Sequence, residues 1–323
     1  MSRFSLRYAS DLGDGIYAVD TGYIRPQFDA CYIITQRAPS SERIAVIDCG
    51  TPHSIERILT TLTDLECQPD QVDYIILTHI HLDHAGGAGQ LMQLCLNAQL
   101  VVHPRGVKHM IDPSMLKAGA IKVYGEEVFT KEYGDFQSIE AHRVIEATDQ
   151  FMVNLAGRIL LCIDTPGHAK HHITIWDQMS RGAFTGDTFG ISYREFDTEK
   201  GAFIFPSSTP IHFDPKALRA SLKKIMLYQP EWIYPTHFSK IGQVPRLYQK
   251  LTEMLSHVED LGISMKKVDN RHELLKIGLL NLYIQELRDQ GCQLSDSKID
   301  QLLQLDVELN AQGMGVWLNA LQT

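Results

Sequence analysis

A dense group of potential metal ligands occupies residues 78–87, which read Thr-His-Ile-His-Leu-Asp-His-Ala-Gly-Gly. Imidazole binds zinc, iron or manganese, and a carboxylate adds negative charge that neutralises a bound cation. One short segment with several such side chains can therefore present ligands to two adjacent metal ions. The four candidate ligands in this segment are His79, His81, Asp83 and His84.

The apolar run Tyr74–Leu77 directly precedes these ligands and predicts a short, buried strand. Side chains of a continuing strand alternate between its faces, so His79 and His81 can meet one cation only if the chain turns there. We expect Asp83 and His84 to begin the following helix and to point away from the first pair. A polar surface turn without a metal is the alternative, and the pattern His-x-His-x-Asp-His directly after a buried strand disfavours it.

Four more apolar segments end in an acidic or imidazole side chain. Sites in open α/β sheets usually lie beyond the carboxyl ends of the strands. We therefore expect these four side chains to meet the histidine segment at one edge of the sheets. They are Asp48 after Ile44–Ile47, His168 in the turn after Ile163, Asp187 after Phe184, and His237 after Trp232–Pro235.

Taken in order, these motifs resemble the metallo-β-lactamase superfamily, specifically its two-metal hydrolases with glyoxalase II-like metal motifs. The resemblance covers roughly the first three-quarters of the chain and implies a site for two divalent ions, with zinc favoured and iron or manganese as alternatives. It also implies that Asp48 supports the histidine segment without touching a metal. The implied ligands are His79, His81 and His168 for one ion and Asp83, His84 and His237 for the other, with Asp187 bridging both.

Such a pair of ions can perform hydrolysis without a serine or cysteine nucleophile. Two cations roughly 3.5–4 Å apart share a bridging water and lower its pKa to roughly 7, which gives hydroxide at neutral pH. The hydroxide attacks an electrophilic carbon or phosphorus, while the cations polarise the acceptor oxygen and stabilise the leaving group. Asp83 is placed to accept or pass on a proton as the leaving group departs. The leading hypothesis is a metal-dependent hydrolase of a thioester, ester or lactone.

Other functions compatible with these ligands remain open. A phosphodiesterase is the first alternative, although the tRNA-processing members of the superfamily add a basic arm that this acidic chain lacks. An oxidoreductase with a single iron, like the persulfide dioxygenases, keeps the same histidines. A ligand-sensing protein on the same scaffold would have lost ligands, and none is lost here. The loop after Asp187 lacks the cysteine and arginine that hold glutathione in glyoxalase II, and the helical C-terminus loosely resembles bacterial hydrolases of acyl-thioesters.

Composition narrows the class of protein. The chain has 323 residues and a net charge of −9, which argues against nucleic acid as a partner because phosphate binding needs clustered cations. We find neither a signal peptide at residues 1–5 nor an apolar stretch that could span a bilayer. We therefore expect a cytoplasmic protein with a small-molecule substrate and no membrane partner. Reduced, mostly buried thiols are expected at Cys31, Cys49, Cys67, Cys95, Cys162 and Cys292.

Alternating short strands and helices predict the elements that position the site. Two β-rich halves with helices outside suggest an α/β fold, a four-layer αββα sandwich, and the family resemblance implies the same. We assign residues 1–244 to this catalytic domain, with a helical insertion at residues 104–135 near the mouth of the pocket. Residues 245–323 form an all-helical segment that either covers the active site or makes a homodimer contact. Its expected helices are Pro245–Leu261, Arg271–Gln290 and Ser295–Leu309, the middle one apolar nearly all round and so buried on several sides.

Residues near the ligands suggest further roles. Tyr193, Arg194 and Phe196 follow Asp187 in a long loop, and a cation there could meet a substrate carboxylate or phosphate. We nominate Tyr193 and Arg194 for substrate contact; the alternative is a solvated arginine above packed aromatic rings. His171 and His172 either support the site or begin a strand, and we leave both out of the ligand set.

Overall fold

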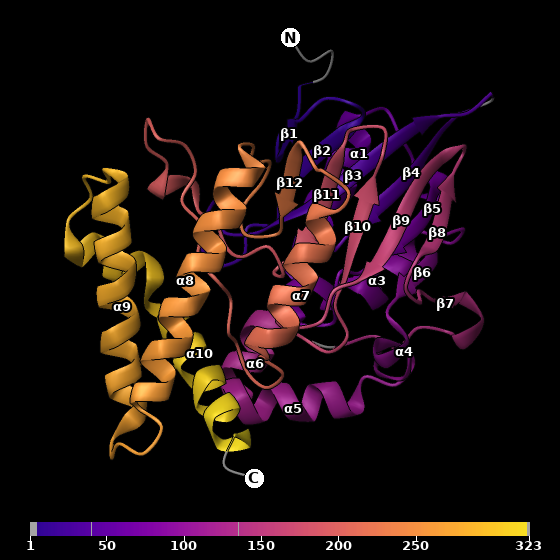
Figure 1. The fold of residues 1–323 in the computed structure, drawn as a ribbon. Coiled ribbons are helices and arrows are strands. Elements are labelled where there is room, and N and C mark those ends of the chain that lie inside the picture. The colour runs from indigo at the N-terminus through magenta and orange to yellow at the C-terminus, as the bar shows by residue number, and fades with distance from the viewer. Residues whose placement is uncertain (1–4, 40, 135, 322–323) are drawn as a thin grey trace.

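Two β-sheets lie face to face in the computed structural model, which describes residues 5–39, 41–134 and 136–321 (Figure 1). The first sheet has the order β1-β2-β3-β4-β5-β6-β7, antiparallel from β1 to β4 and parallel from β4 to β7. Its strands are β1 (Ala9–Asp11), β2 (Ile16–Asp20), β3 (Ala30–Arg37), β4 (Glu42–Ile47), β5 (Val72–Ile76), β6 (Gln99–Val102) and β7 (Val144–Glu146).

The second sheet has the order β12-β11-β10-β9-β8, and only the pair β11–β12 is parallel. Because each sheet is covered on both faces, its central strands carry apolar residues on both faces rather than on one. In β5, for example, Ile76 packs between the sheets while Ile75 packs under the outer helices. The strands are β8 (Phe151–Leu155), β9 (Arg158–Asp164), β10 (Ile173–Asp177), β11 (Gly182–Gly186) and β12 (Trp232–Pro235).

Helices cover the outer face of each sheet. The first sheet packs against α1 (Ile55–Asp64) and α3 (Ala88–Leu94), and the second against α7 (Pro215–Met226) and α8 (Val244–Ser264). The architecture is therefore the expected αββα sandwich. None of the described helices is long and apolar enough to cross a membrane. Residues 1–4, part of the segment inspected for a targeting signal, lie outside the described residues.

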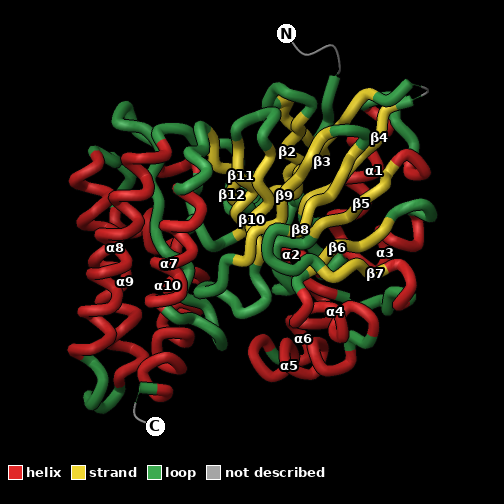
Figure 2. The backbone as a smooth tube through the Cα atoms, turned by 45° about the vertical axis from the view of Figure 1, so that its right-hand side comes forward, coloured by secondary structure: helices red, strands yellow, loops and turns green. Residues whose placement is uncertain are grey.

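The insertion between β6 and β7 is helical, as expected. It contains α4 (Pro104–Ile111), α5 (Ser114–Tyr124) and α6 (Glu126–Tyr133), which lie together at one end of the sandwich (Figure 2). Asp135, the expected end of the insertion, lies outside the described residues.

The C-terminal helices α8, α9 (Arg271–Gln290) and α10 (Asp296–Ala320) pack beside the sheets (Figure 1). Two expectations for them are wrong. The last helix continues to Ala320 instead of ending at Leu309, although Gly313 and Gly315 weaken its local helix propensity. The middle helix, α9, is fully buried along one stripe only, and its Ile277 is 58% exposed, because α9 lies on the outside of the helical group. The buried stripe is Leu275, Leu279, Tyr283 and Leu287.

All six cysteines fall in the described segments, where each is buried and unpaired.

Candidate metal centre

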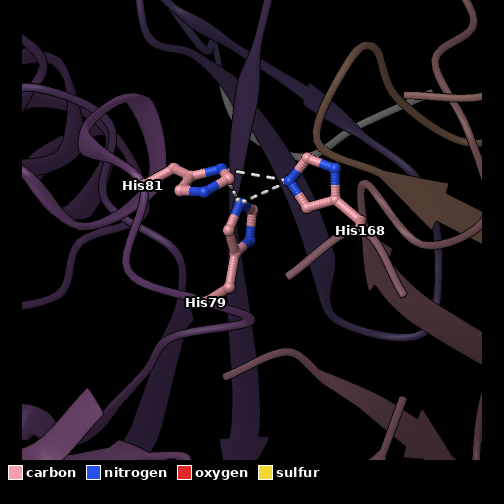
Figure 3. Close-up of side chains that lie close together, drawn as sticks. All are labelled: His79, His81 and His168. Carbon is pink, nitrogen blue, oxygen red and sulfur yellow. Dashed lines mark hydrogen bonds between the residues drawn. The ribbon is translucent and has the colours of Figure 1, made fainter. Parts of the chain in front are cut away.

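The chain turns sharply between β5 and α2 (Leu82–Ala85), and this turn brings the first two histidines together. His79 Nε2 lies 3.0 Å from His81 Nδ1. His168, from the turn after β9, places its Nε2 3.0 Å from His81 Nδ1 and 3.3 Å from His79 Nε2 (Figure 3). Nitrogens bound to one tetrahedral zinc at 2.0–2.1 Å would be roughly 3.3 Å apart. The three imidazoles therefore have the spacing of a single metal site.

A second group forms at α2 itself, which carries Asp83 and His84. His237 follows β12, and its Nε2 lies 3.4 Å from Asp83 Oδ2. His84 Nε2 lies 3.6 Å from the same oxygen. Asp83, His84 and His237 thus form a group of three. The expectation that His84 points away from the first pair is wrong: its ring centroid lies 3.9 Å from that of His79, because the two groups are adjacent.

Asp187, which follows β11, lies between the two groups. Its Oδ1 is 3.4 Å from His84 Nε2 and 3.7 Å from His237 Nε2. Its Oδ2 is 3.7 Å from His168 Nε2. The two carboxylate oxygens of one side chain therefore face different groups of imidazoles.

Two of these atoms, His84 Nε2 and Asp187 Oδ1, are buried and make no hydrogen bond among the described residues, although they lie 3.4 Å apart. A buried polar atom without a partner destabilises a fold by about 1–3 kcal/mol, so native proteins rarely retain one. A cation on these atoms removes the penalty. The donor set of imidazoles and carboxylates is also the one that zinc, iron and manganese accept. The residues present fit a metal centre.

Asp48, at the end of β4, holds the centre together. Its Oδ1 accepts a hydrogen bond from the Thr78 backbone N–H at 2.8 Å. Its Oδ2 lies 2.9 Å from His84 Nδ1 and also accepts bonds from the hydroxyls of Thr78, at 2.8 Å, and Thr236, at 3.0 Å. Asp48 therefore connects three strand ends and orients His84, as expected of a residue that supports the ligands.

The two groups differ in their protonation. In the first, burial and then the neighbouring imidazoles lower the pKa of His81 and of His168 to about 3. In the second, burial opposes protonation, but nearby carboxylates prevail and raise the pKa of His84 to about 10 and of His237 to about 9. Asp83 and Asp187 are the carboxylates common to both shifts. Without a metal, the first group is thus neutral and the second holds protons that a cation would displace.

His171 and His172 also contact the centre. His172 is buried, its Nε2 accepts a hydrogen bond from the Asp187 backbone N–H at 3.3 Å, and its ring stacks on His79. His171 accepts a bond from the Ile80 backbone N–H at 3.4 Å. Strand β10 begins at Ile173, directly after His172. Both histidines therefore support the metal segment and also lead into a strand, so the two sequence interpretations are compatible.

A cavity of about 320 Å³ opens over the centre, with Asp83, Asp187 and His237 exposed to it. Helix α10, in the C-terminal segment, contributes Leu305, Asp306 and Leu309 to its wall. Most of the wall is apolar, including Phe28, Leu116, Ala120, Ile191, Leu305 and Leu309.

The residues nominated for substrate contact lie elsewhere: neither Tyr193 nor Arg194 is among the described residues that line this cavity. Tyr193 is fully buried, stacks on Phe28 and donates its hydroxyl to Asp306 at 3.0 Å. Arg194 donates to the Ser192 carbonyl at 2.9 Å and pairs with Asp197. Phe196, the third loop residue, is also fully buried.

Asp306, on α10, is a buried carboxylate in the cavity wall that sequence reasoning missed; His109 and His212, which also line the cavity, were missed too. Asp306 is only 6% exposed, and burial raises its pKa to about 7 despite the Tyr193 hydrogen bond. A lone acidic residue in an amphipathic helix normally marks a solvated face. No local signal in the sequence distinguishes Asp306 from such a residue.

Comparisons with known proteins agree with this geometry. The family model described as the metallo-beta-lactamase superfamily matches residues 25–237. The metallo-beta-lactamase fold-containing protein ST1585 of Sulfurisphaera tokodaii is 27% identical over 252 residues, which cover 76% of this chain and 86% of that protein. The probable metallo-hydrolase YybB of Bacillus subtilis is 24% identical over 226 residues, covering 68% of this chain and 80% of YybB.

Among solved structures, the metallo-beta-lactamase family protein TTHA1429 from Thermus thermophilus superposes with a TM-score of 0.67 at 18% identity, covering 97% of this chain and 95% of that one. The crystal structure of ST1585 gives a TM-score of 0.64 at 22% identity, covering 94% of this chain and 98% of that one. At these identities the structural likeness establishes the fold.

Proposed function

This chain belongs to the metallo-β-lactamase superfamily, and from that premise we propose that it is a two-metal hydrolase of a thioester, ester or lactone. The observation that carries the proposal is the position of Asp187, whose two oxygens face two separate groups of ligands. One carboxylate in this position suits a pair of neighbouring cations better than a single ion.

The proposed ligands are His79, His81 and His168 for one ion and Asp83, His84 and His237 for the other, with Asp187 between them. Zinc is the favoured ion, since imidazole and carboxylate ligands at tetrahedral spacing suit it. Bound there, divalent cations polarise the substrate carbonyl and lower the pKa of water, which supplies a nucleophile at neutral pH.

The chain's own side chains supply the rest of the reaction. The apolar cavity wall binds the hydrocarbon part of the substrate and excludes bulk water. Hydrolysis of a thioester breaks the bond between the acyl carbon and the sulfur. The hydroxyl group of water goes to the acyl carbon and its hydrogen to the sulfur, so the products are a carboxylic acid and a free thiol. Asp83 is exposed to the cavity, with 24% of its side chain accessible, and passes the proton to the departing sulfur or oxygen.

Substitution of one ligand from the first group and of the shared carboxylate tests the proposal. We expect His81→Ala and Asp187→Ala to reduce metal content below two ions per chain and to reduce turnover of acyl-thioesters, esters and lactones to background. Matched controls are His142→Ala and Asp269→Ala, which remove an exposed histidine and an exposed aspartate away from the centre. Circular dichroism and thermal unfolding establish that each variant is folded.

Elemental analysis and a parallel substrate panel distinguish the alternatives. A single iron per chain with no hydrolysis would support a persulfide dioxygenase-like oxidoreductase instead. Faster turnover of a chromogenic phosphodiester than of any thioester, ester or lactone would support a phosphodiesterase. Full activity in a folded, metal-free Asp187→Ala variant would refute metal-dependent hydrolysis altogether.

A further inference from the structure

A second cavity, of about 440 Å³, adjoins the cavity over the metal centre. The two share three histidines in their walls: His109, His171 and His212. The ring of His171 lies 5.6 Å from that of His81 on one side and 5.6 Å from that of His212 on the other. The second cavity, here called the vestibule, therefore begins one side chain away from the candidate ligands.

Cations concentrate in the vestibule wall. Arg105 and Lys108 come from α4, and Lys170 from the turn between His168 and β10. Glu146, at the end of β7, is the one carboxylate residue that lines it. The vestibule thus has an excess of two positive charges in a chain whose net charge is −9.

These cations are not engaged in ion pairs. In residues 5–39, 41–134 and 136–321, no carboxylate lies within ion-pair distance of Arg105, Lys108 or Lys170, although most other arginines of the described chain have such a partner. Burial lowers the pKa of both His212 and His109, and the nearby cations (Lys170 and Arg105 for His212, Lys108 for His109) lower it further. Unpaired like charges gathered around a concave surface raise the local concentration of anions.

We propose, on the premise of the hydrolase described above, that the vestibule binds a phosphate on the leaving group of the substrate. The substrate class is then a thioester whose thiol carries a phosphate at its far end. The acyl chain lies in the apolar cavity, the carbonyl lies at the metal ligands, and the thiol extends past His171 and His212 to the cations. A phosphate monoester carries about −1.5 to −2 charges at pH 7, which matches the excess charge of the wall better than a single carboxylate does. Arg105 offers a bidentate fork to its oxygens, and Lys108 and Lys170 offer point charges.

Three thioesters of one acyl group test this assignment because they differ only beyond the sulfur. They are octanoyl-pantetheine, which has no phosphate, octanoyl-4′-phosphopantetheine, which has one, and octanoyl-coenzyme A, which has the additional nucleotide. We expect kcat/KM for the phosphopantetheine thioester to exceed that for the pantetheine thioester roughly 10- to 50-fold, through KM. A further gain with coenzyme A would mean that the nucleotide is recognised as well, and equal values would mean that the phosphate suffices.

The double variant Arg105→Gln/Lys170→Gln should bring the ratio between the phosphopantetheine and pantetheine thioesters close to one. Raising the ionic strength should shrink this ratio in the unmodified protein, because salt screens exposed charges. The control Lys223→Gln/Lys267→Gln removes two exposed cations that line neither cavity and should leave the ratio unchanged. Equal kcat/KM for both thioesters in the unmodified protein, or an unaltered ratio in the double variant, would overturn the phosphate site while leaving the hydrolase intact.

Binding of the free thiols decides the phosphate site independently of turnover. Isothermal titration of phosphopantetheine and of pantetheine into the metal-loaded protein should show tighter binding of the phosphorylated thiol, and the double variant should lose this difference. If none of the three thioesters is hydrolysed, thioester hydrolysis fails, and the titration still reports whether the vestibule takes a phosphate. Equal binding of the two thiols would overturn the site.

Discussion

The metal-ligand group and the wall of the cavity above it are built on different principles. Every ligand candidate lies in a segment that follows a strand, Asp83 and His84 in the short helix α2, and all fall within the residues that the family model matches. Asp48 connects several of the strand ends by hydrogen bonds. The wall combines loop residues of the sandwich, such as Phe28 and Ile191, with residues of α5, α6 and α10, and α10 lies outside the matched residues. Asp187 and Asp306 show the contrast: one aspartate lies among imidazoles, while the other has a tyrosine hydroxyl as its hydrogen-bond partner. The sandwich thus holds the candidate ligands, and the added helices contribute to the cavity above them.

Removal of the metal should have the largest effect on activity and stability, and this effect should arise in the ligand group. Dialysis against a chelator should abolish turnover, and added zinc should restore it. A ligand at about 1,000 times its Kd stabilises a folded protein by about 4 kcal/mol, which for a chain of this length corresponds to a melting temperature roughly 6 °C higher. Calorimetry with and without chelator measures the shift. Unchanged activity and melting temperature after complete metal removal, verified by elemental analysis, would contradict the proposed centre.

The next largest effect should be on the free energy of unfolding. It should come from substitution of Asp306 and should depend on pH. Burial raises the pKa of this carboxyl to about 7 in the metal-free protein, so between about pH 4 and pH 7 the folded state keeps a proton that the unfolded chain has released. The free energy of unfolding should therefore fall as pH rises through this window. Asp306→Asn keeps an acceptor for the Tyr193 hydroxyl and removes the ionisable group, so above pH 7 the variant should be more stable by up to about 4 kcal/mol.

Urea unfolding of the metal-free protein at several pH values measures this difference. Asp300→Asn, an exposed change on the same helix, is the control and should follow the unmodified protein at every pH. Parallel stability curves for Asp306→Asn and the unmodified protein between pH 4 and pH 8 would refute the assignment.

The difference between the two regions also explains what the sequence could predict. The strand ends were predictable because buried strands appear as apolar runs, and because the residue following such a run is constrained to one edge of the sheet. His79, His81, Asp83 and His84 are moreover close in sequence, so their convergence needs only a turn. The more distant candidates, such as His237, could be predicted only because the motifs occur in the same order as in the family that the chain resembles.

The cavity wall could not be predicted in this way because its residues meet only through tertiary packing. Asp306 looks like any polar residue on an amphipathic helix, and Arg105 and Lys108, in the wall of the neighbouring vestibule, look like ordinary solvated charges. Proximity in sequence was misleading for Tyr193, which follows Asp187 closely but lies behind the cavity wall, where it contacts the wall residues Phe28 and Asp306. The burial of α9 was overestimated because an apolar composition does not show whether a helix has a second neighbour to cover it.

A change in α10 should disturb the wall and leave the ligands in place. A Cβ atom at Gly313 would lie 1.7 Å from the Ser208 carbonyl oxygen, a backbone atom that cannot rotate away. Gly313→Ala should therefore push α10 from the loop at Ser207–Thr209, which lines the cavity, and destabilise the protein by about 3 kcal/mol. We expect KM to rise severalfold while the metal content stays the same. Gly315→Ala is the matched control: its Cβ would meet only Arg271, at 3.9 Å, so the variant should be neutral or up to about 1 kcal/mol more stable. Equal melting temperatures and KM values for the two variants would show that α10 does not set the shape of the wall.

The smallest effect should be a loss of metal affinity on substitution of Asp48, which supports the ligands without occupying a ligand position in either group. For His84 to offer its Nε2 to a cation, its Nδ1 must carry the proton and donate it to Asp48 Oδ2. Asp48→Asn can place an amide donor opposite that N–H and so favours the tautomer in which Nε2 is protonated and unable to bind metal. Loss of such a supporting hydrogen bond typically weakens metal affinity 10- to 100-fold, or about 1.4–2.7 kcal/mol.

Titration of zinc against a competing chelator measures this affinity for each ion, and the effect should fall on the group that contains His84 while the group of His79, His81 and His168 keeps its affinity. Asp164→Asn alters another aspartate at a strand end, one that lies outside the centre, and should leave both affinities unchanged. An equal loss at both sites in Asp48→Asn would mean that Asp48 holds the whole histidine segment through Thr78, whereas no loss at either site would remove it from the metal centre.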